Sequence, residues 1–201
     1  MSKLTLEFYQ RKDVLLISRE LLGKVLCTNF HNKLTSGIIV ETEAYGGITD
    51  KASHAYGGRR TQRTNIMYTK GGSAYVYLCY GIHHLFNVVT NVEGVPHAIL
   101  IRAIQPLDGI DLMLQRRNIE KPILKLTSGP GILSQALGIS IINSGSSLLG
   151  NKIWIENRKN QLIDNINIIS SPRVGIKFAG EDASNPWRFN IEGNPWVSLA
   201  K

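Results

Sequence analysis

Two glutamates lie two residues apart at the end of a predicted strand. Glu41 and Glu43 follow the β-branched run 38–40 and directly precede a glycine-rich segment. Side chains at positions i and i+2 of a strand point to the same face, so the two carboxylates are expected to lie together. Paired carboxylates are a common acid–base arrangement, in which one of them activates water. The simpler alternative is an exposed strand end with two hydrated glutamates.

The segment that follows the glutamates is basic along its whole length. Residues 51–92 contain no Asp or Glu and five Lys or Arg side chains, which supply +5 of the formal net charge of +8. Basic side chains neutralise phosphates and aromatic rings stack on bases, so this segment predicts a nucleic-acid surface. The alternative is an accident of composition in which the tyrosines fill the core. The tyrosines in or just before this segment are Tyr45, Tyr56, Tyr68, Tyr75, Tyr77 and Tyr80.

Metal and serine chemistry have weaker support in the sequence. The three clustered histidines, His54, His83 and His84, show no H-x-x-x-H or H-E-x-x-H spacing, and Cys27 and Cys79 are too few for a four-ligand zinc site. No serine lies in a G-x-S-x-G motif. We therefore expect no metal and no cofactor.

Helices and strands in alternation must position these residues. A run that starts at Asp13 and stops at Gly23 predicts a capped amphipathic helix. Ser128-Gly129-Pro130 predicts the start of another helix, whose free N–H groups either bind phosphate or are simply capped. The predicted strands are 24–30, 34–42, 73–80, 85–90 and 98–104, the later helices are 107–117 and 130–137, and short strands are expected over 152–200.

One strand and one loop carry most of the aromatic and basic residues. Residues 46–72 are rich in Gly, Arg, Thr and Asn with little aliphatic periodicity, and loops of this length are usually functional. Alternation along 73–80 places Tyr77 and Tyr80 on opposite faces of the strand. Tyr75 and Cys79 are expected beside Tyr77.

Length and composition limit the architecture. A chain of 201 residues without repeat, linker or low-complexity tract predicts one mixed α+β domain, 1–201, with an antiparallel sheet. The longest apolar runs are far shorter than the roughly 20 residues that a membrane span needs. The N-terminus lacks the apolar stretch of a secretory signal. We expect a soluble cytoplasmic protein without membrane contact, nucleoid-associated in a bacterium or nuclear in a eukaryote.

Seven segments, in order along nearly the whole chain, are specific to one protein family. They are Ile39–Tyr45, His54–Arg63, Tyr75–Gly81, Leu100–Ala103, Ser128–Pro130 with Gln135–Leu137, Arg173–Gly175 with Ala179–Glu181, and Gly193–Ser198. Together they closely resemble the alkyladenine (3-methyladenine) DNA glycosylase family of base-excision repair, of the methylpurine-DNA glycosylase type. The resemblance implies a curved antiparallel sheet flanked by helices, with a tyrosine-bearing hairpin that enters DNA.

The resemblance also implies a role for each matching residue. Glu43 matches the general base that activates water, and Arg102 and the backbone carbonyl of Val174 match the other groups around that water. Pocket residues and DNA-contacting residues form two further sets. The pocket residues are Tyr45, His54 and Tyr77 in the walls and Asn87 on the floor, where it rejects normal guanine. The DNA contacts are Tyr80, which fills the gap left by the flipped base, and Arg59, Thr61, Arg63 and Met67 in the loop.

The implied reaction is hydrolysis of the N-glycosidic bond of alkylated purines in double-stranded DNA. The expected substrates are 3-methyladenine and 7-methylguanine, with hypoxanthine and ethenoadenine less secure. No lysine matches a lyase position, so we expect a monomeric, monofunctional enzyme that leaves an abasic site. Two alternatives remain: a noncatalytic nucleic-acid-binding module, and a hydrolase that acts on a free nucleoside or sugar through Glu41 and Glu43.

Overall fold

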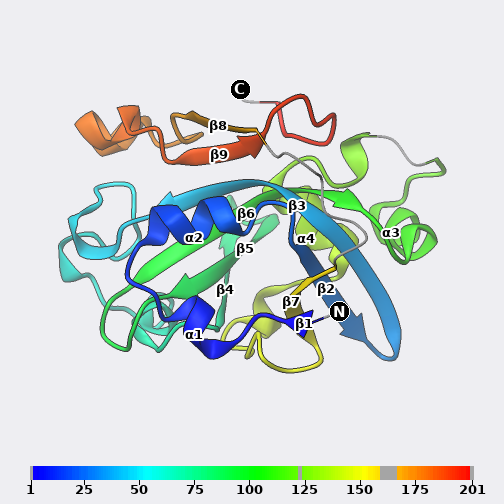
Figure 1. The fold of residues 1–201 in the computed structure, drawn as a ribbon, viewed down its shortest axis with the longest axis horizontal. Coiled ribbons are helices and arrows are strands. Elements are labelled where there is room, and N and C mark those ends of the chain that lie inside the picture. Colours follow the sequence, from blue (N-terminus) through cyan, green and yellow to red (C-terminus); the bar gives the residue numbers. More distant parts are fainter. Residues whose placement is uncertain (1, 122–123, 159–166, 200–201) are drawn as a thin grey trace.

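The computed structural model describes residues 2–121, 124–158 and 167–199, and it confirms a mixed α+β fold with a curved antiparallel sheet. Its central strand order is β1-β7-β2-β3-β6-β5-β4, and β9 pairs with both β3 and β8. Figure 1 shows β3 arching across the molecule, with β8 and β9 layered beside it. The strands are β1 (Ser2–Lys3), β2 (Val25–Phe30), β3 (Lys33–Tyr45), β4 (Ala74–Cys79), β5 (His83–Thr90), β6 (His97–Pro106), β7 (Ile153–Asn157), β8 (Ile168–Ser171) and β9 (Arg188–Ile191).

The helices are short and pack on this sheet. Helix α2 packs on β3 and β6, whereas α4 packs on β5 and β6 and also on α3. The α-helices are α1 (Leu6–Tyr9), α2 (Val14–Glu20), α3 (Ile110–Arg117) and α4 (Pro130–Leu137). The 3-10 segments are η1 (Gly47–Thr49), η2 (Tyr56–Gly58), η3 (Asn65–Tyr68), η4 (Leu124–Leu126), η5 (Ile141–Asn143) and η7 (Lys177–Ser184). None of the helices in the described part of the chain is long and apolar enough to cross a membrane.

Local sequence explains most of the element boundaries. The Oδ1 atom of Asp13 accepts hydrogen bonds from the N–H groups of Leu15 and Leu16, as predicted for the N-cap of α2. Helix α4 begins at Pro130 as expected, but Ser128 does not cap it. The Oγ atom of Ser128 instead donates to the carbonyl oxygen of Leu124 at 2.5 Å.

The C-terminal part of the chain matches its prediction only in part. Strands β7, β8 and β9 lie within the region expected to hold short strands. Residues 177–184, however, form η7 rather than a strand. Residues 159–166 and 200, which belong to the same prediction, lie outside the described residues.

Two register shifts occur where β3 passes between its neighbours. Glu41–Glu43 pair with β6 on one side and with Asn190–Arg188 of β9 on the other, so this stretch is interior to the sheet. The pairing with β6 shifts between Ile39 and Glu41 and again between Glu41 and Thr42. Such bulges locally re-aim side chains, and they are common next to functional sites.

The two faces of β6 differ in character. Ile99, Ile101 and Ala103 belong to the main hydrophobic cluster. Leu100 and Arg102, which alternate with them, line a cavity. The strand period of two therefore separates the closed core from the cavity.

The hairpin of β4 and β5 ends in a strained turn. Tyr80 (φ 51°) and Gly81 (φ 73°) both adopt left-handed backbone conformations, and the N–H of Ile82 donates to the carbonyl oxygen of Cys79 at 3.2 Å. This is the pattern of a type I′ turn, which favours glycine at its central positions. The left-handed conformation costs Tyr80 on the order of 1–2 kcal/mol, because its Cβ crowds the backbone. Strand β4 ends at Cys79, so the turn rather than strand alternation sets the direction of Tyr80.

Truncation of Ile101 tests the assignment of the closed face. Ile101 is fully buried in the main cluster, so Ile101→Ala should lower the free energy of unfolding by about 2–5 kcal/mol. The control is Ile82→Ala, which should change it by less than about 0.5 kcal/mol because Ile82 is exposed. Urea unfolding measures both values. Equal losses in the two variants would contradict this division of the sheet.

Candidate active site

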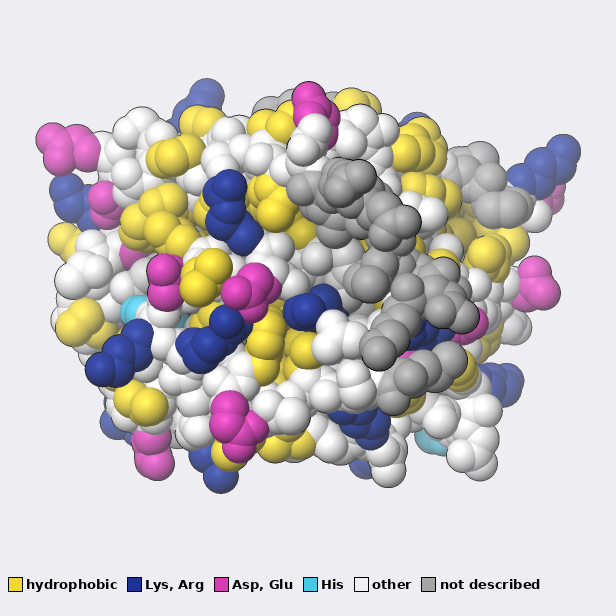
Figure 2. All heavy atoms as spheres, viewed as in Figure 1, with side chains coloured by type: hydrophobic (Ala, Val, Ile, Leu, Met, Phe, Trp, Pro, Cys, Tyr) yellow, Lys and Arg dark blue, Asp and Glu magenta, His cyan; other side chains and the backbone are white. Residues whose placement is uncertain are grey.

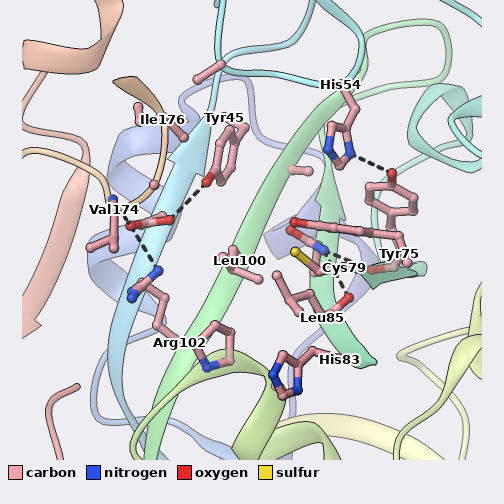
Figure 3. Close-up of a pocket in the computed structure, with 18 of the residues that line it drawn as sticks. Tyr45, His54, Tyr75, Cys79, His83, Leu85, Leu100, Arg102, Val174 and Ile176 are labelled. Atoms are coloured by element: carbon pink, nitrogen blue, oxygen red, sulfur yellow. Dashed lines mark hydrogen bonds and ion pairs between the residues drawn. The ribbon is translucent and has the colours of Figure 1, made fainter. Parts of the chain in front are cut away.

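A cavity of about 650 Å³ lies beside the sheet and collects most of the residues singled out in the sequence. Its volume is in the usual range for small-molecule sites. Figure 3 shows Tyr45 and Val174 on one side of the cavity and His54 and Tyr75 on the opposite side. Strands β3 to β6, the first residues of α4 and the segment 174–178 contribute to its lining. The predicted residues in the lining are Glu43, Tyr45, His54, Arg63, Met67, Tyr77, Tyr80, Asn87, Arg102 and Val174.

The carboxylate of Glu43 forms part of the wall and is held from three directions. Its Oε1 atom accepts a hydrogen bond from the N–H of Val174 at 2.7 Å and lies 3.2 Å from Nη1 of Arg102. Its Oε2 atom accepts from the hydroxyl of Tyr45 at 2.9 Å. Val174 thus contacts Glu43 through its backbone N–H. The sequence prediction concerned its carbonyl, whose contact with water stays a prediction.

Glu41 and Glu43 share one face of β3, as alternation predicts. Both carboxylates bind Arg102, whose Nε atom lies 2.7 Å from Oε1 of Glu41. Both glutamate side chains are fully buried, so the alternative of two hydrated glutamates is wrong. Burial by itself would lower the pKa of Arg102, but Glu43 and Glu41 outweigh it and raise this pKa. Arg102 therefore stays charged.

An aromatic cluster forms the wall opposite Glu43. The rings of His54 and Tyr77 meet edge to face with centroids 4.6 Å apart, and those of Tyr75 and Tyr77 lie 5.5 Å apart. The Nδ1 atom of His54 lies 2.8 Å from the hydroxyl of Tyr75. Burial, followed by Arg63 and Arg59, lowers the pKa of His54 to about 4, and burial raises that of Tyr75 to about 12. Both rings are neutral at physiological pH.

Tyr45 is fixed from behind by an ion pair. The guanidinium of Arg173 lies 4.8 Å from the centroid of the Tyr45 ring and forms two hydrogen bonds with the carboxylate of Asp50. Arg173 also donates to the carbonyl oxygen of Ala44. Burial first, and then the carboxylate of Glu43, raise the pKa of Tyr45 well above its usual value. Tyr45 therefore stays a hydrogen-bond donor to Glu43.

Asn87 has a fixed orientation deep in the cavity. Its side-chain amide Nδ2 donates to the carbonyl oxygens of Tyr75 at 3.1 Å and of Leu85 at 3.3 Å. Only 3% of its side chain is exposed. A group held by two backbone carbonyls cannot turn to suit a new neighbour, so Asn87 imposes a fixed shape on whatever enters.

The side chains at the rim of the cavity are more exposed to solvent than those in its wall. Tyr80 is 89% exposed and Phe178 is 75% exposed, and both lie in the cavity lining. Arg59 and Thr61 are exposed on the loop but outside the lining, whereas Arg63 is exposed and within it. On the face drawn in Figure 2, which has the view of Figure 1, basic and acidic side chains are interspersed as on an ordinary solvated surface.

Met67 is the predicted residue whose position differs from expectation. It is predicted among the DNA contacts of the loop, but its side chain is 1% exposed. It packs with Tyr68 and Tyr75 in a small buried cluster and lines the cavity. A short apolar stretch of η3 folds inward here, because burying a methionine side chain is favourable. The alternative in which the tyrosines fill the core therefore holds for Tyr68 and Tyr75.

Several residues of the site were not predicted as site residues. Asp50 had no signal beyond its charge, and Arg173 had only its place in a segment that resembles the family, because their pairing joins positions 123 residues apart. Tyr75 was expected on the same strand face as Tyr77 and lies in a segment that resembles the family, but it was not assigned to the pocket that it lines. The remaining unpredicted lining residues with polar or aromatic character include Cys79, His83 and Phe178.

The lowered pKa of His54 makes a prediction for stability. Between pH 6.5 and about 4 the unfolded chain binds a proton at this position that the folded protein does not, so stability falls as the pH falls. The slope from this group approaches about 1.4 kcal/mol per pH unit. Unfolding free energies of wild type and His54→Gln, measured at several pH values from 7 to 4.5, should converge as the pH falls. Parallel curves would contradict a neutral, partly buried His54.

Comparisons with known proteins agree with the resemblance noted in the sequence. A model of the family described as methylpurine-DNA glycosylase matches residues 7–195. A protein of Desulfitobacterium hafniense (strain Y51), provisionally named a 3-methyladenine DNA glycosylase, is 45% identical over 206 aligned positions that cover 99% of this chain and 100% of the relative.

Two further relatives carry the same provisional name. The protein of Chlamydia felis (strain Fe/C-56) is 49% identical over 183 positions, which cover 90% of this chain and 92% of the relative. The protein of Clostridium acetobutylicum is 46% identical over 206 positions, which cover 99% of this chain and 98% of the relative. Since both the family match and these relatives extend over nearly the whole length, the chain belongs to the methylpurine-DNA glycosylase family.

Proposed function

We propose that this DNA glycosylase flips alkylated purines out of double-stranded DNA and hydrolyses the bond between base and deoxyribose with a water activated by Glu43. The observation that supports it best is the carboxylate of Glu43, buried among three donors in the wall of an aromatic cavity. A protein that only bound nucleic acid would gain nothing from a buried negative charge beside its phosphate-binding surface.

The chemistry follows from what surrounds Glu43. Loss of the base leaves positive charge on the sugar, and a fixed carboxylate stabilises that charge and accepts a proton from the attacking water. The donors from Val174, Tyr45 and Arg102 keep the carboxylate in one orientation, so little reorganisation is needed at the moment of reaction. The carbonyl of Val174 and the guanidinium of Arg102 complete the water site in this proposal.

The aromatic walls suit a cationic, electron-poor base. An alkylated purine that carries positive charge is attracted to the faces of Tyr45 and Tyr77. Stacking returns roughly 1–3 kcal/mol per aromatic contact, which offsets the few kcal/mol that flipping a damaged base costs. A neutral His54 adds no repulsive charge and still offers hydrogen bonds to the base. The fixed Asn87 excludes the exocyclic amino group of normal guanine.

Substrate range follows from leaving-group ability. 3-Methyladenine and 7-methylguanine already carry the positive charge that makes a purine depart readily. Hypoxanthine and ethenoadenine are neutral and need a proton, which a histidine with a pKa of about 4 does not supply at neutral pH. We therefore expect both to be excised more slowly than the alkylated bases.

The rim supplies the DNA contacts in this proposal. Tyr80 lies at the tip of the β4–β5 hairpin, exposed and strained, as suits a side chain that enters the duplex where the base has left. Arg59, Thr61 and Arg63 lie on the exposed loop, where the two arginines can neutralise backbone phosphates. One compact monomer with one cavity is enough for this task.

A lyase step is not part of the proposal. It would require a lysine near the sugar with a depressed pKa. Lys51 and Lys70 are exposed and lie outside the cavity lining. The product is then an abasic site in an intact strand, and strand breaks formed by pure protein at neutral pH, before heat or alkali, would overturn this part.

Replacement of Glu43 tests the catalytic step. Glu43→Gln should slow single-turnover release of 7-methylguanine from a labelled duplex by about 100-fold or more, because the amide cannot accept the proton of water. Binding to the damaged duplex should persist. The matched control is Glu192→Gln at an exposed position, which should excise like wild type. Wild-type rates in Glu43→Gln would contradict the mechanism, and a wild-type protein that binds but never excises would favour the noncatalytic binder.

Replacement of Tyr80 tests the wedge. Tyr80→Ala should weaken binding to a damaged duplex and slow excision, whereas Tyr80→Phe should retain both because it keeps the ring. Stability should change little in either variant, since the side chain is 89% exposed. Fluorescence anisotropy and single-turnover excision measure the two effects. If Tyr80→Ala behaves as wild type in both assays, Tyr80 has no wedge role.

A further inference from the structure

Glu41 is the most completely coordinated carboxylate of the site, yet the proposed reaction gives it no task. Its Oε1 atom accepts hydrogen bonds from Nε of Arg102 at 2.7 Å, from Nε of Arg188 at 2.7 Å and from Oγ of Ser198 at 2.9 Å. Its Oε2 atom accepts from the N–H of Ser198 at 2.7 Å. The side chain is fully buried and is absent from the cavity lining. With its lone pairs engaged and no access to the cavity, Glu41 is unsuited to activate water itself.

Arg102 connects this carboxylate to Glu43. The guanidinium is a rigid planar fork, so the direction of one N–H fixes the directions of the others. Its Nε is held by Glu41, its Nη2 donates to Oγ of Ser198 at 3.3 Å, and its Nη1 lies 3.2 Å from Oε1 of Glu43. Two of the three nitrogens are thus anchored away from the cavity, and the third reaches the proposed general base.

We propose that Glu41 is a positioning residue for base excision: together with Ser198 it holds the guanidinium of Arg102 in place and thereby orients the carboxylate of Glu43 to activate the attacking water. The proposal rests on the glycosylase function proposed above. It assigns different tasks to the two glutamates that the sequence presents as a pair.

The charge balance of the cluster supports an ionised Glu41. Two carboxylates, Glu41 and Glu43, face two guanidinium groups, Arg102 and Arg188. Burial would raise the pKa of Glu41, but Arg102, the hydrogen bonds of Ser198 and the charge of Arg188 outweigh it, so this pKa is lowered. A buried ion pair of this kind is costly to break, because removal of one partner leaves an uncompensated charge.

Ser198, far along the sequence from Glu41, completes the coordination of its carboxylate. Ser198 contacts Glu41 across 157 positions of sequence. The preceding turn is fixed by Asn194, whose Oδ1 accepts from the N–H of Trp196 at 2.9 Å and whose Nδ2 donates to Oε1 of Gln105 at 3.0 Å. The segment Gly193–Ser198, one of those that resemble the family, therefore has a structural role. It places the hydroxyl and the N–H of Ser198 against the carboxylate of Glu41.

A purely structural role for Glu41 is the alternative, and the chain offers a matched control for it. Glu156 of β7 is also a buried glutamate, 5% exposed, with Nε of Arg158 at 2.5 Å from its Oε1. It lies outside the cavity lining and has no recorded contact with Arg102 or Glu43. Glu156→Gln should therefore reproduce the general cost of removing a buried charge without disturbing the site.

The test compares Glu41→Gln with Glu156→Gln in the intact chain, after the fraction of folded protein has been measured for each. Two readouts are taken: the single-turnover release of 7-methylguanine from a duplex, and the Kd for a duplex with a tetrahydrofuran abasic analogue. Glu41→Gln should excise about 100-fold more slowly per folded molecule with an unchanged Kd, because small misplacements of reacting groups cost rate rather than affinity. Glu156→Gln should excise at the wild-type rate.

Two further variants separate the hydrogen bonds that hold Arg102 from the charge of Glu41, and one of them replaces Glu41→Gln if that variant does not fold. Ser198→Ala removes one hydrogen bond to Glu41 and one to Arg102, and should slow excision less than Glu41→Gln because the N–H of Ser198 remains. Arg188→Gln added to Glu41→Gln removes the surplus positive charge without restoring the charged carboxylate that holds Arg102, so stability should recover and the rate should not. If Glu41→Gln does not fold, Ser198→Ala with the same readouts decides.

The outcomes distinguish this proposal from the glycosylase proposal. A wild-type excision rate in Glu41→Gln overturns the positioning role. If Glu41→Gln is unfolded, a wild-type rate in Ser198→Ala overturns it instead. An excision rate that recovers when Arg188→Gln is added to Glu41→Gln also overturns it. The glycosylase function still stands in these cases if wild type excises and Glu43→Gln does not. A wild-type protein without excision overturns both.

Discussion

A buried cluster of two carboxylates and two guanidinium groups is the interaction on which the rest of this structure depends. Glu41, Glu43, Arg102 and Arg188 come from three adjacent strands, β3, β6 and β9. Charges taken out of water are tolerated only when they are paired and hydrogen-bonded. The pairing therefore constrains the register of β9 against β3, and the bulges between β3 and β6 accompany it. The pairing of β9 with β3 and the position of the Glu43 carboxylate are thus tied to the same buried charges.

The rigid residues and the strained residue of the site lie at different ends of the cavity. At the wall, Glu43 is buried and Tyr45 is partly buried, and both are fixed by hydrogen bonds and, for Tyr45, by the ion pair of Arg173 with Asp50. At the rim, Tyr80 is exposed and held in a left-handed conformation by a tight turn. A rigid wall suits chemistry that needs fixed dipoles. An exposed rim suits contact with a large polymer that must first be deformed.

Local sequence patterns predicted most of the helices and strands, but they did not predict contacts between residues that are far apart in the sequence. β-Branched runs located the strands, Asp13 located α2, and period-two alternation placed Glu41 and Glu43 together, since each of these signals is confined to a few neighbouring residues. The role of Ser198 was not predictable, because its partner lies 157 positions away and no local pattern encodes that contact. Inward packing of Met67 and the left-handed turn at Tyr80 also depend on tertiary structure. The assignment of the base, the wedge and the pocket residues came from the family resemblance and stays a prediction.

The central claim is that Glu43 acts on the sugar of a nucleotide flipped into this cavity. A crystal structure of the protein with a duplex that contains a cationic pyrrolidine abasic nucleotide tests it most directly, because that ring mimics the charge of the departing sugar. We expect the pyrrolidine within the cavity, a water between it and the carboxylate of Glu43, and Tyr80 inserted in the base stack. A pyrrolidine that stays stacked within the duplex, or that binds away from Glu43, would contradict it.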